Sequence, residues 1–316
     1  MEPVLLSPDN WTPPSRTPWG GRALLALKER LAIADDKRLW RAVGESWELS
    51  VDPQFPSTLA DGTTLAAAIA RDRHAWLGAT PEPSTPLLVK LIDAAEALSF
   101  QVHPHDDDPA LAPHESGKPE CWVILRASPG AGVFLGFEPG VTRADVDDAL
   151  DRDASLTTLL TFVPVVAGDA FTITPGTVHA IGAGVTLLEA QLVRPGRSGV
   201  TYRFWDWNRG RPLHRERAMA VATFAPAHDA LVPRSAPAPG VSAVLAFAGM
   251  HVERVRGPGR AVVGPRHVLQ AVVALADLTV NGVPVPRGQT LAIPAATGAL
   301  TFELGPDAEA WLVRVE

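Results

Sequence analysis

Short runs of alternating apolar residues, separated by Pro and Gly, recur along most of the chain. This spacing is typical of β-strands joined by turns. The strongest strands are expected at residues 121–127, 132–137 and 200–209, with a continuous β pattern at 164–191. From about residue 230 onwards the sequence contains only short strand-like runs. The pattern therefore predicts a mainly β protein.

A few segments have helical periodicity instead. Apolar residues recur at helical spacing in residues 64–78, and shorter helices are expected within 26–39 and 212–224. A longer break in the β pattern, at about 140–162, contains Thr142 as a candidate N-cap. We interpret this break as a small helical insertion with solvated acidic residues.

Two segments share one layout. Residues 168–184 and 288–305 each begin with Gly, form a short strand, turn at Pro and continue as another strand. Only the first carries a histidine, His179, after the turn. We therefore expect two jelly-roll-like β-sandwich units. We expect residues 1–225, which contain His179, to form a metal-binding catalytic domain and residues 226–316 to form a C-terminal domain without metal ligands.

Composition limits the classes of function. The 316 residues are 46% hydrophobic and 20% charged, as in globular proteins, and the net charge of −7 argues against nucleic acid as a partner. The single cysteine, Cys121, permits no intrachain disulfide, which fits a reducing compartment. The first residues do not have the pattern of a signal peptide, so none is expected, and no run of about 18 apolar residues occurs in the sequence. We predict a cytoplasmic protein without membrane contact.

Four polar residues suggest a metal site. Gln101 and His103 are two residues apart at the end of a strand, so their side chains share one face. Glu120 begins the next strong strand, and His179 follows the turn "TPGT". Such nitrogen and oxygen donors suit Zn²⁺, with Mn²⁺, Co²⁺ and Fe²⁺ as alternatives. The competing interpretation is that both histidines are ordinary surface or core residues.

The ordered motifs "LSFQVHP", "GKPECW", "TPGTVHAIGAG" and "TYRFWDW" resemble those of the type I mannose-6-phosphate isomerases, in their short bacterial branch within the cupin superfamily. The resemblance extends from about residue 18 to residue 207. It implies one zinc ion per chain, bound by Gln101, His103, Glu120 and His179. It also implies interconversion of mannose 6-phosphate and fructose 6-phosphate through a cis-enediol.

The resemblance further implies roles for residues around the metal. Arg203, Lys118 and Glu189 match catalytic positions, and Ser99, Lys118 and Arg203 match positions that contact the substrate. Arg203 would hold an enediolate or phosphate oxygen, and Lys118 would hold phosphate or move a proton. Glu189 would act as the base or orient a ligand. A strand-end surface carboxylate is the competing interpretation for Glu189.

The segment between Glu189 and Arg203 is longer than in the family and adds Arg194 and Arg197, which either bind phosphate or belong to a solvated loop. Two other functions stay open. One is a different metal cupin, such as an Fe²⁺-dependent oxygenase, and the other is a non-catalytic sugar-binding cupin. For the isomerase, the expected partner is a small sugar phosphate and the expected state is a monomer or weak homodimer.

Overall fold

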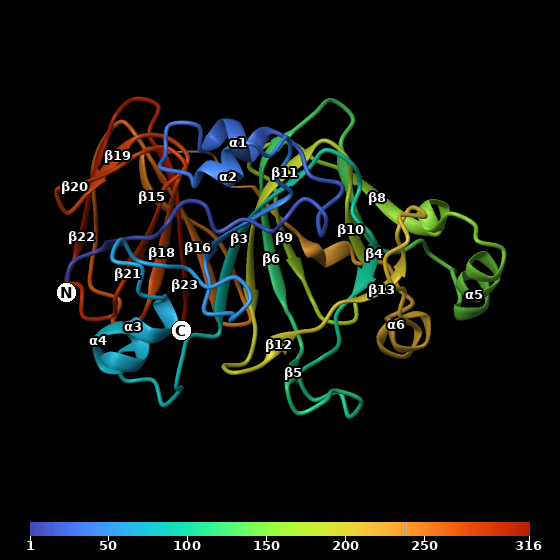
Figure 1. Cartoon of the computed structure of the whole chain (residues 1–316). Helices are drawn as coiled ribbons and strands as arrows, with labels where there is room; N and C mark the ends of the chain where they lie inside the picture. Colours follow the sequence, from blue (N-terminus) through green and yellow to red (C-terminus); the bar gives the residue numbers. More distant parts are fainter. Residues whose placement is uncertain (235, 237) are drawn as a thin grey trace. The chain divides into compact units, whose positions relative to one another are not determined.

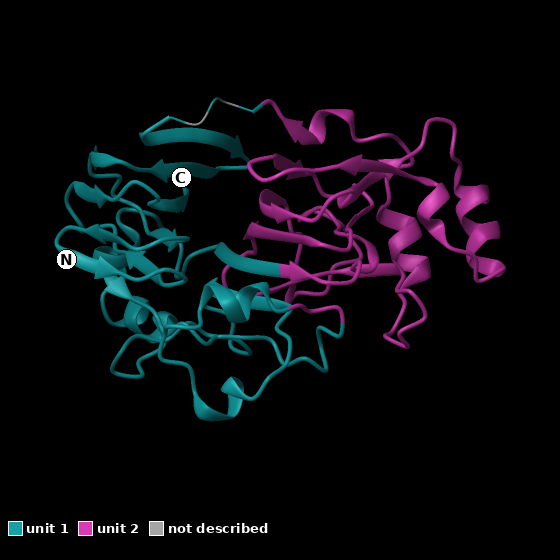
Figure 2. Cartoon of the chain, turned by 90° about the horizontal axis from the view of Figure 1, so that it is seen from above, with its two compact units in different colours: residues 1–18, 22–92, 234–316 teal, residues 19–21, 93–233 magenta. Residues whose placement is uncertain are grey.

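The computed structural model describes residues 1–234, 236 and 238–316. It confirms a mainly β protein, and the larger sheets are antiparallel (Figure 1). The chain divides into two compact units, coloured separately in Figure 2. Unit 1 comprises residues 1–18, 22–92 and 234–316, and unit 2 comprises residues 19–21 and 93–233.

Unit 2 contains two facing groups of strands. One group has the order β14-β9-β6-β11, and the other has the order β13-β4-β10-β7-β8. Its elements are β4 (Phe100–Val102), β5 (Glu115–Ser116), β6 (Glu120–Ala127), β7 (Gly132–Phe137), α5 (Arg143–Asp151), the 3-10 helix η1 (Leu156–Thr158), β8 (Leu160–Pro164), β9 (Ala170–Ile173), β10 (His179–Ile181), β11 (Val185–Leu192), β12 (Ser198–Gly199), β13 (Tyr202–Trp205), α6 (Arg215–Val221), the 3-10 helix η2 (His228–Ala230) and β14 (Leu231–Val232).

The segment at about 140–162, predicted as a helical insertion, contains α5 and η1, but its last residues, 160–162, begin the strand β8. Thr142 is the N-cap of α5, and its hydroxyl accepts a hydrogen bond from the backbone N–H of Asp145. The Asp145 carboxylate in turn accepts from the backbone N–H of Thr142, which completes a capping box. Val146 and Ala149, on the inner face of α5, pack in a core cluster with Phe100 and Phe137. The insertion therefore contributes to the core of unit 2.

Unit 1 also contains two sheets, with orders β1-β21-β18-β23-β16-β15 and β17-β22-β19-β20. Phe302 and Leu312, from different sheets, belong to the core cluster between them. Its elements are β1 (Val4–Leu5), α1 (Ala23–Leu27), α2 (Asp35–Arg38), β2 (Glu45–Leu49), α3 (Leu65–Arg71), α4 (Arg73–Leu77), β15 (Gly240–Phe247), β16 (Met250–Arg256), β17 (Gly259–Val263), β18 (Gln270–Ala274), β19 (Leu278–Val280), β20 (Val283–Val285), β21 (Thr290–Ile293), β22 (Leu300–Leu304) and β23 (Glu309–Val315), and β3 (Leu87–Ala94) crosses the boundary with unit 2.

The repeated layout has a structural counterpart in each unit. In unit 2, β9 pairs with β6 in one sheet, and β10, after the Pro turn, belongs to the opposite sheet. In unit 1, β21 pairs with β18 and β22 lies in the other sheet. Gly168 and Gly288, which begin the two segments, have φ angles of 93° and 84°, a left-handed conformation that favours glycine.

Two helices are shorter than the periodicity predicts. Of residues 26–39, only 26–27, at the end of α1, and 35–38, which form α2, are in α-helices. The segment 64–78 divides at Asp72, whose φ and ψ of −147° and 72° are not helical and whose carboxylate caps α4. Asp72 caps the start of α4, whereas α1 and α2 have no side-chain hydrogen bond at their N-caps, and periodicity alone does not detect such helix boundaries.

The compact units differ from the domain order expected from the sequence. Most of residues 1–92 cluster with residues 234–316 rather than with the segment that carries the candidate ligands. One reason is that β1 pairs with β21, 286 residues away along the chain. The division of roles between residues 1–225 and 226–316 stays a prediction. Across the described residues, no helix is long and apolar enough to cross a membrane.

Candidate metal centre

Strand register brings the candidate residues of unit 2 together. Gln101, in the central position of β4, lies opposite His179 of β10 on one side and Arg203 of β13 on the other. In the other sheet, Glu120 at the start of β6 lies opposite Gln191 of β11. The predicted residues thus come from neighbouring strands of two sheets.

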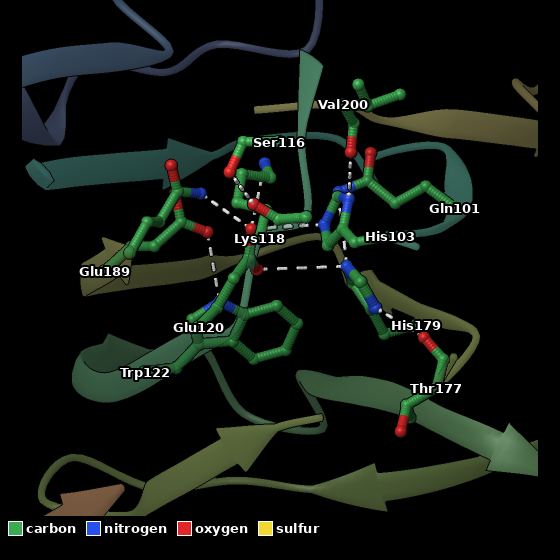
Figure 3. A network of polar contacts seen from close by, with 12 residues as sticks. Gln101, His103, Ser116, Lys118, Glu120, Trp122, Thr177, His179, Glu189 and Val200 are labelled. Carbon is green, nitrogen blue, oxygen red and sulfur yellow. Dashed lines mark hydrogen bonds and ion pairs between the residues drawn. The ribbon is translucent and has the colours of Figure 1, made fainter. Parts of the chain in front are cut away.

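Three side chains form a buried cluster (Figure 3). One potential ligand atom from each of His103, Glu120 and His179 lies within 4.8 Å of the others. Nε2 of His103 is 3.1 Å from Oε1 of Glu120, and Nε2 of His179 is 3.9 Å from Oε2. All three side chains are almost completely inaccessible to solvent.

Backbone carbonyls orient both imidazoles. Nδ1 of His103 donates to the carbonyl oxygen of Val200 at 2.8 Å, and Nδ1 of His179 donates to that of Thr177 at 2.9 Å. A carbonyl oxygen only accepts hydrogen bonds, so Nδ1 carries the proton in each ring. The Nε2 atoms of the neutral rings therefore direct their lone pairs into the cluster.

The donor atoms of this cluster fit a divalent cation. Burial, followed by the charge of Lys118, lowers the pKa of His103, while burial and the neighbouring His103 lower the pKa of His179 to about 3. With neutral rings, the 3.1 Å contact sets a nitrogen lone pair against a carboxylate oxygen, so neither atom can donate. Accordingly, among the described residues neither Nε2 of His103 nor Oε2 of Glu120 has a hydrogen-bond partner. A shared cation resolves this conflict.

Glu120 is kept ionised by its neighbours. Burial alone would raise the pKa of its carboxyl group, but Lys118 and the imidazoles outweigh burial and hold that pKa well below the usual range. Nζ of Lys118 lies 2.9 Å from Oε1 of Glu120, and Nε2 of Gln191 donates to the same oxygen at 2.6 Å. Oε1 is therefore held by protein donors, while Oε2 faces the cluster.

Gln101 is at the edge of this cluster. Its Nε2 is 3.3 Å from Nε2 of His179, and its Oε1 accepts from the hydroxyl of Ser99 at 3.3 Å. A half-turn of the amide would exchange its oxygen and nitrogen. In the structure the amide nitrogen faces His179, so ligation through the oxygen of Gln101 stays a prediction. Ser99 is buried and contacts Gln101, which places it behind this candidate ligand.

Glu189 is buried rather than exposed at a strand end. Its Oε1 accepts from the indole N–H of Trp122 at 3.1 Å, and its Oε2 accepts from Nε2 of Gln191 at 2.6 Å (Figure 3). The same Gln191 nitrogen binds Glu120, so the two carboxylates are bridged by one amide. This arrangement suits the orienting role for Glu189 better than that of a base.

Arg203 is half-buried next to another basic group. Its backbone N–H donates to Nδ1 of His214 at 3.2 Å. Burial, and after it the positive charges of Arg203 and Arg217, lowers the pKa of His214. The guanidinium thus adds positive charge near β4 and β13.

The additional arginines bind neighbouring loops. Nε of Arg194 is 3.1 Å from Oδ2 of Asp106, and Nη1 of Arg197 donates to the carbonyl of Glu115 at 3.3 Å. The solvated-loop interpretation therefore gains support, with these contacts anchoring the loop.

Two other residues near the metal strands lie outside the cluster. His105 is exposed and does not belong to the cluster. Cys121 is buried, and burial raises the pKa of its thiol.

Sequence reasoning missed Gln191 and the backbone carbonyl of Val200. Gln191 is two residues after Glu189 on β11, the same spacing that singled out Gln101 and His103. That signal could have found it. The carbonyl of Val200 has no side-chain signature, because any residue at this position presents the same atom.

Comparison with known proteins places these motifs in context. The chain is 34% identical over 186 residues to a mannose-6-phosphate isomerase of Streptococcus mutans, and 31% identical over 214 residues to one of Bacillus subtilis. The alignments cover 56% and 64% of this chain and 55% and 64% of those relatives, so they span less than two thirds of either relative. No family model matches the sequence. The relatives confirm the resemblance seen in the motifs.

Solved structures extend the likeness to the whole chain. The mannose 6-phosphate isomerase of Bacillus subtilis matches 100% of both chains with a TM-score of 0.77 at 23% identity. A putative mannosephosphate isomerase of Archaeoglobus fulgidus matches 100% of this chain and 98% of its own, with a TM-score of 0.81 at 23% identity. A mannose 6-phosphate isomerase bound with zinc and yttrium matches 100% and 99%, with a TM-score of 0.73 at 16% identity. These likenesses show that the chain shares the fold of these solved structures over its whole length.

Proposed function

We propose that this chain, which resembles the type I mannose-6-phosphate isomerases in sequence and fold, is a metal-dependent aldose–ketose isomerase that interconverts mannose 6-phosphate and fructose 6-phosphate. The observation that carries the proposal is that two buried acceptor atoms of the cluster, Nε2 of His103 and Oε2 of Glu120, have no hydrogen-bond partner among the described residues, as a shared cation would require. The curated relatives supply the reaction, since both are named mannose-6-phosphate isomerases.

Zn²⁺ is the proposed metal. The zinc-bound isomerase structure of the same fold and the donor types of the cluster support this choice. His103, Glu120 and His179 would hold the ion, with Gln101 as a fourth ligand through its oxygen. When bound, zinc supplies Lewis-acid polarisation of a carbonyl and stabilises negative charge.

The chain's own residues would move protons and bind the substrate. Isomerisation transfers a proton between C1 and C2 of the sugar through a cis-enediol. Lys118 brings a positive charge and N–H donors to the edge of the cluster, which suits binding of phosphate or transfer of a hydroxyl proton. Arg203, opposite Gln101 on the next strand, offers a permanently charged group to an enediolate or phosphate oxygen.

The decisive experiment is a coupled isomerase assay on mannose 6-phosphate. The protein is assayed as purified, after chelation, and after addition of Zn²⁺, Mn²⁺, Co²⁺ or Fe²⁺. Turnover that is lost on chelation and restored by metal supports the proposal and ranks the metals. A folded, metal-loaded protein without turnover would exclude this substrate.

The same preparation separates the alternatives. An Fe²⁺-dependent oxygenase would consume O₂ with a suitable substrate, and a non-catalytic cupin would bind sugar phosphate without converting it. The names of the relatives favour neither. The proposal includes a cytoplasmic location and a monomer or weak homodimer, which fractionation and sedimentation would check.

A further inference from the structure

The additional loop after β11 is fixed to the segment that precedes Lys118. β12 pairs in parallel with β5, with Gly199 in register with Ser116. Val200 N–H donates to the carbonyl oxygen of Ser116 at 3.0 Å. Since Ser116 is two residues before Lys118, the pairing holds the backbone of Gly199 close to the Lys118 side chain.

Gly199 lies against the lysine so closely that a side chain does not fit. A Cβ atom at this position would lie 2.8 Å from Cδ and 3.3 Å from Cγ of Lys118, and 3.0 Å from Cγ2 of Val193. The φ angle of Gly199 is outside the left-handed region, so glycine is needed here for space rather than for backbone conformation.

Lys118 has little freedom to avoid such an atom without leaving its position. Its side chain is only 9% exposed, and its Nζ is 2.9 Å from Oε1 of Glu120. An added methyl group would meet the middle of a flexible side chain rather than rigid backbone. The expected response is therefore a displaced lysine in a folded protein.

We propose that Gly199 is a positioning residue for Lys118, and that its missing side chain sets the place of the lysine ammonium at Glu120. The importance of that place for catalysis rests on the proposed function. The positioning of Lys118 by Gly199 does not depend on the proposed function, because it concerns only the contact between the loop and the lysine. Gly199 would act through Lys118 and would not contact the substrate.

Lysine labelling tests the geometry without any assay of activity. The chain has four lysines, at positions 28, 37, 90 and 118, so acylation of each can be followed by mass spectrometry. In Gly199→Ala we expect Lys118 to react several-fold faster, relative to the partly exposed Lys37, than in the wild type. Gly298→Ala is the matched control, since a Cβ there meets nothing within 4 Å. Equal labelling of Lys118 in all three proteins would overturn the proposal.

A second variant covers the case in which Gly199→Ala does not fold. Val193→Ala removes Cγ2 of Val193, so that of the three atoms nearest to the added Cβ the double variant V193A/G199A keeps only the two of Lys118. It should show the same faster labelling. Unchanged labelling in this folded double variant would also overturn the proposal.

Steady-state kinetics test whether displacement of Lys118 lowers isomerase activity. We expect kcat/KM for mannose 6-phosphate to fall about 10- to 100-fold in Gly199→Ala, as for a small misplacement of a reacting group. In a Lys118→Met background, Gly199→Ala should cause no further loss, because its effect passes through the lysine. Additive losses would overturn the positioning role. Faster labelling of Lys118 in a protein without isomerase activity would refute the proposed function and support the positioning role.

Discussion

His103, Glu120 and His179 are buried so completely that their donor atoms face one another instead of water. In this respect they differ from His105, which is exposed only two residues after His103. Loss of one buried donor should therefore affect metal binding far more than loss of a nearby surface histidine.

His179→Ala should lower the affinity for zinc by more than about 100-fold, beyond the effect of removing an outer partner of a ligand. The reason is that the variant loses the imidazole whose Nε2 lone pair faces the cluster and whose orientation is fixed by the carbonyl of Thr177. Competition with a chromogenic chelator measures the affinity. His105→Ala is the control and should bind zinc as the wild type does. Equal zinc affinity in both variants would contradict the assignment.

Gln191→Met should weaken zinc binding by about 10- to 100-fold. Methionine matches the size of glutamine but cannot donate to Glu120 and Glu189, so both carboxylates lose a partner within the protein. Gln270→Met, a comparable substitution of a buried glutamine in unit 1, should leave zinc affinity unchanged. Titration of the apo proteins with zinc checks both, and equal affinities would argue against the bridging role of Gln191.

The spacing of residues along strands could be read from the sequence, but contacts between strands could not. Two-residue spacing predicted that Gln101 and His103 share a face, and the Pro-Gly turn marked His179. The bridge from Gln191 to Glu120 depends on the register of β11 with β6, which no local pattern encodes. Long-range register is decided by packing of the whole sheet.

At the level of elements, α5 is a short helix whose first turn is fixed by side-chain hydrogen bonds. The Thr142 side chain and backbone both hydrogen-bond to the Asp145 carboxylate, and these bonds lower the pKa of Asp145. The local sequence was sufficient to predict this helix, because both capping partners lie within its first turn.

Thr142→Ala should destabilise the protein by about 1 kcal/mol, the usual cost of removing an N-cap hydroxyl. Thr142→Ser retains the hydroxyl and should remain close to the wild type. Urea denaturation measures both. Without the Thr142 hydroxyl, the pKa of Asp145 should rise towards its unfolded value. The stability that the lowered pKa contributes should therefore be smaller and should be lost at a higher pH as the solution is acidified. Equal stability of the two variants would show that the Thr142 hydroxyl contributes nothing to stability.

At the level of the whole molecule, neighbours in the structure are often distant in the sequence. Val4 of β1 pairs with Ala292 of β21, so the first strand of the chain completes a sheet of its last segment. Composition and periodicity describe each strand but not its partner. For this reason the mainly β class could be predicted from the sequence, whereas the division into compact units could not.

The metal-free chain should lose stability in acid. Folding lowers the pKa of His179 from an ordinary value of 6.5 to about 3, mainly through burial. Between these values the unfolded chain binds a proton that the folded chain does not, so stability falls as pH decreases from about 6.5 towards 3. Thermal unfolding of chelator-treated protein should show a loss on the order of a few kcal/mol across this range. His179→Gln should flatten the profile, and an unchanged slope would refute the assignment.

The backbone anchors of the two imidazoles have a consequence for how such a protein can diverge. Because Val200 and Thr177 orient the rings through carbonyl oxygens, no single side-chain substitution removes these acceptors. Side chains of the loop that ends at Val200 can change, as its two additional arginines illustrate, while the atom that faces His103 persists. The side chains of this segment can therefore vary while the orientation of His103 is retained, and alanine scanning of the segment would underestimate its contribution to that orientation.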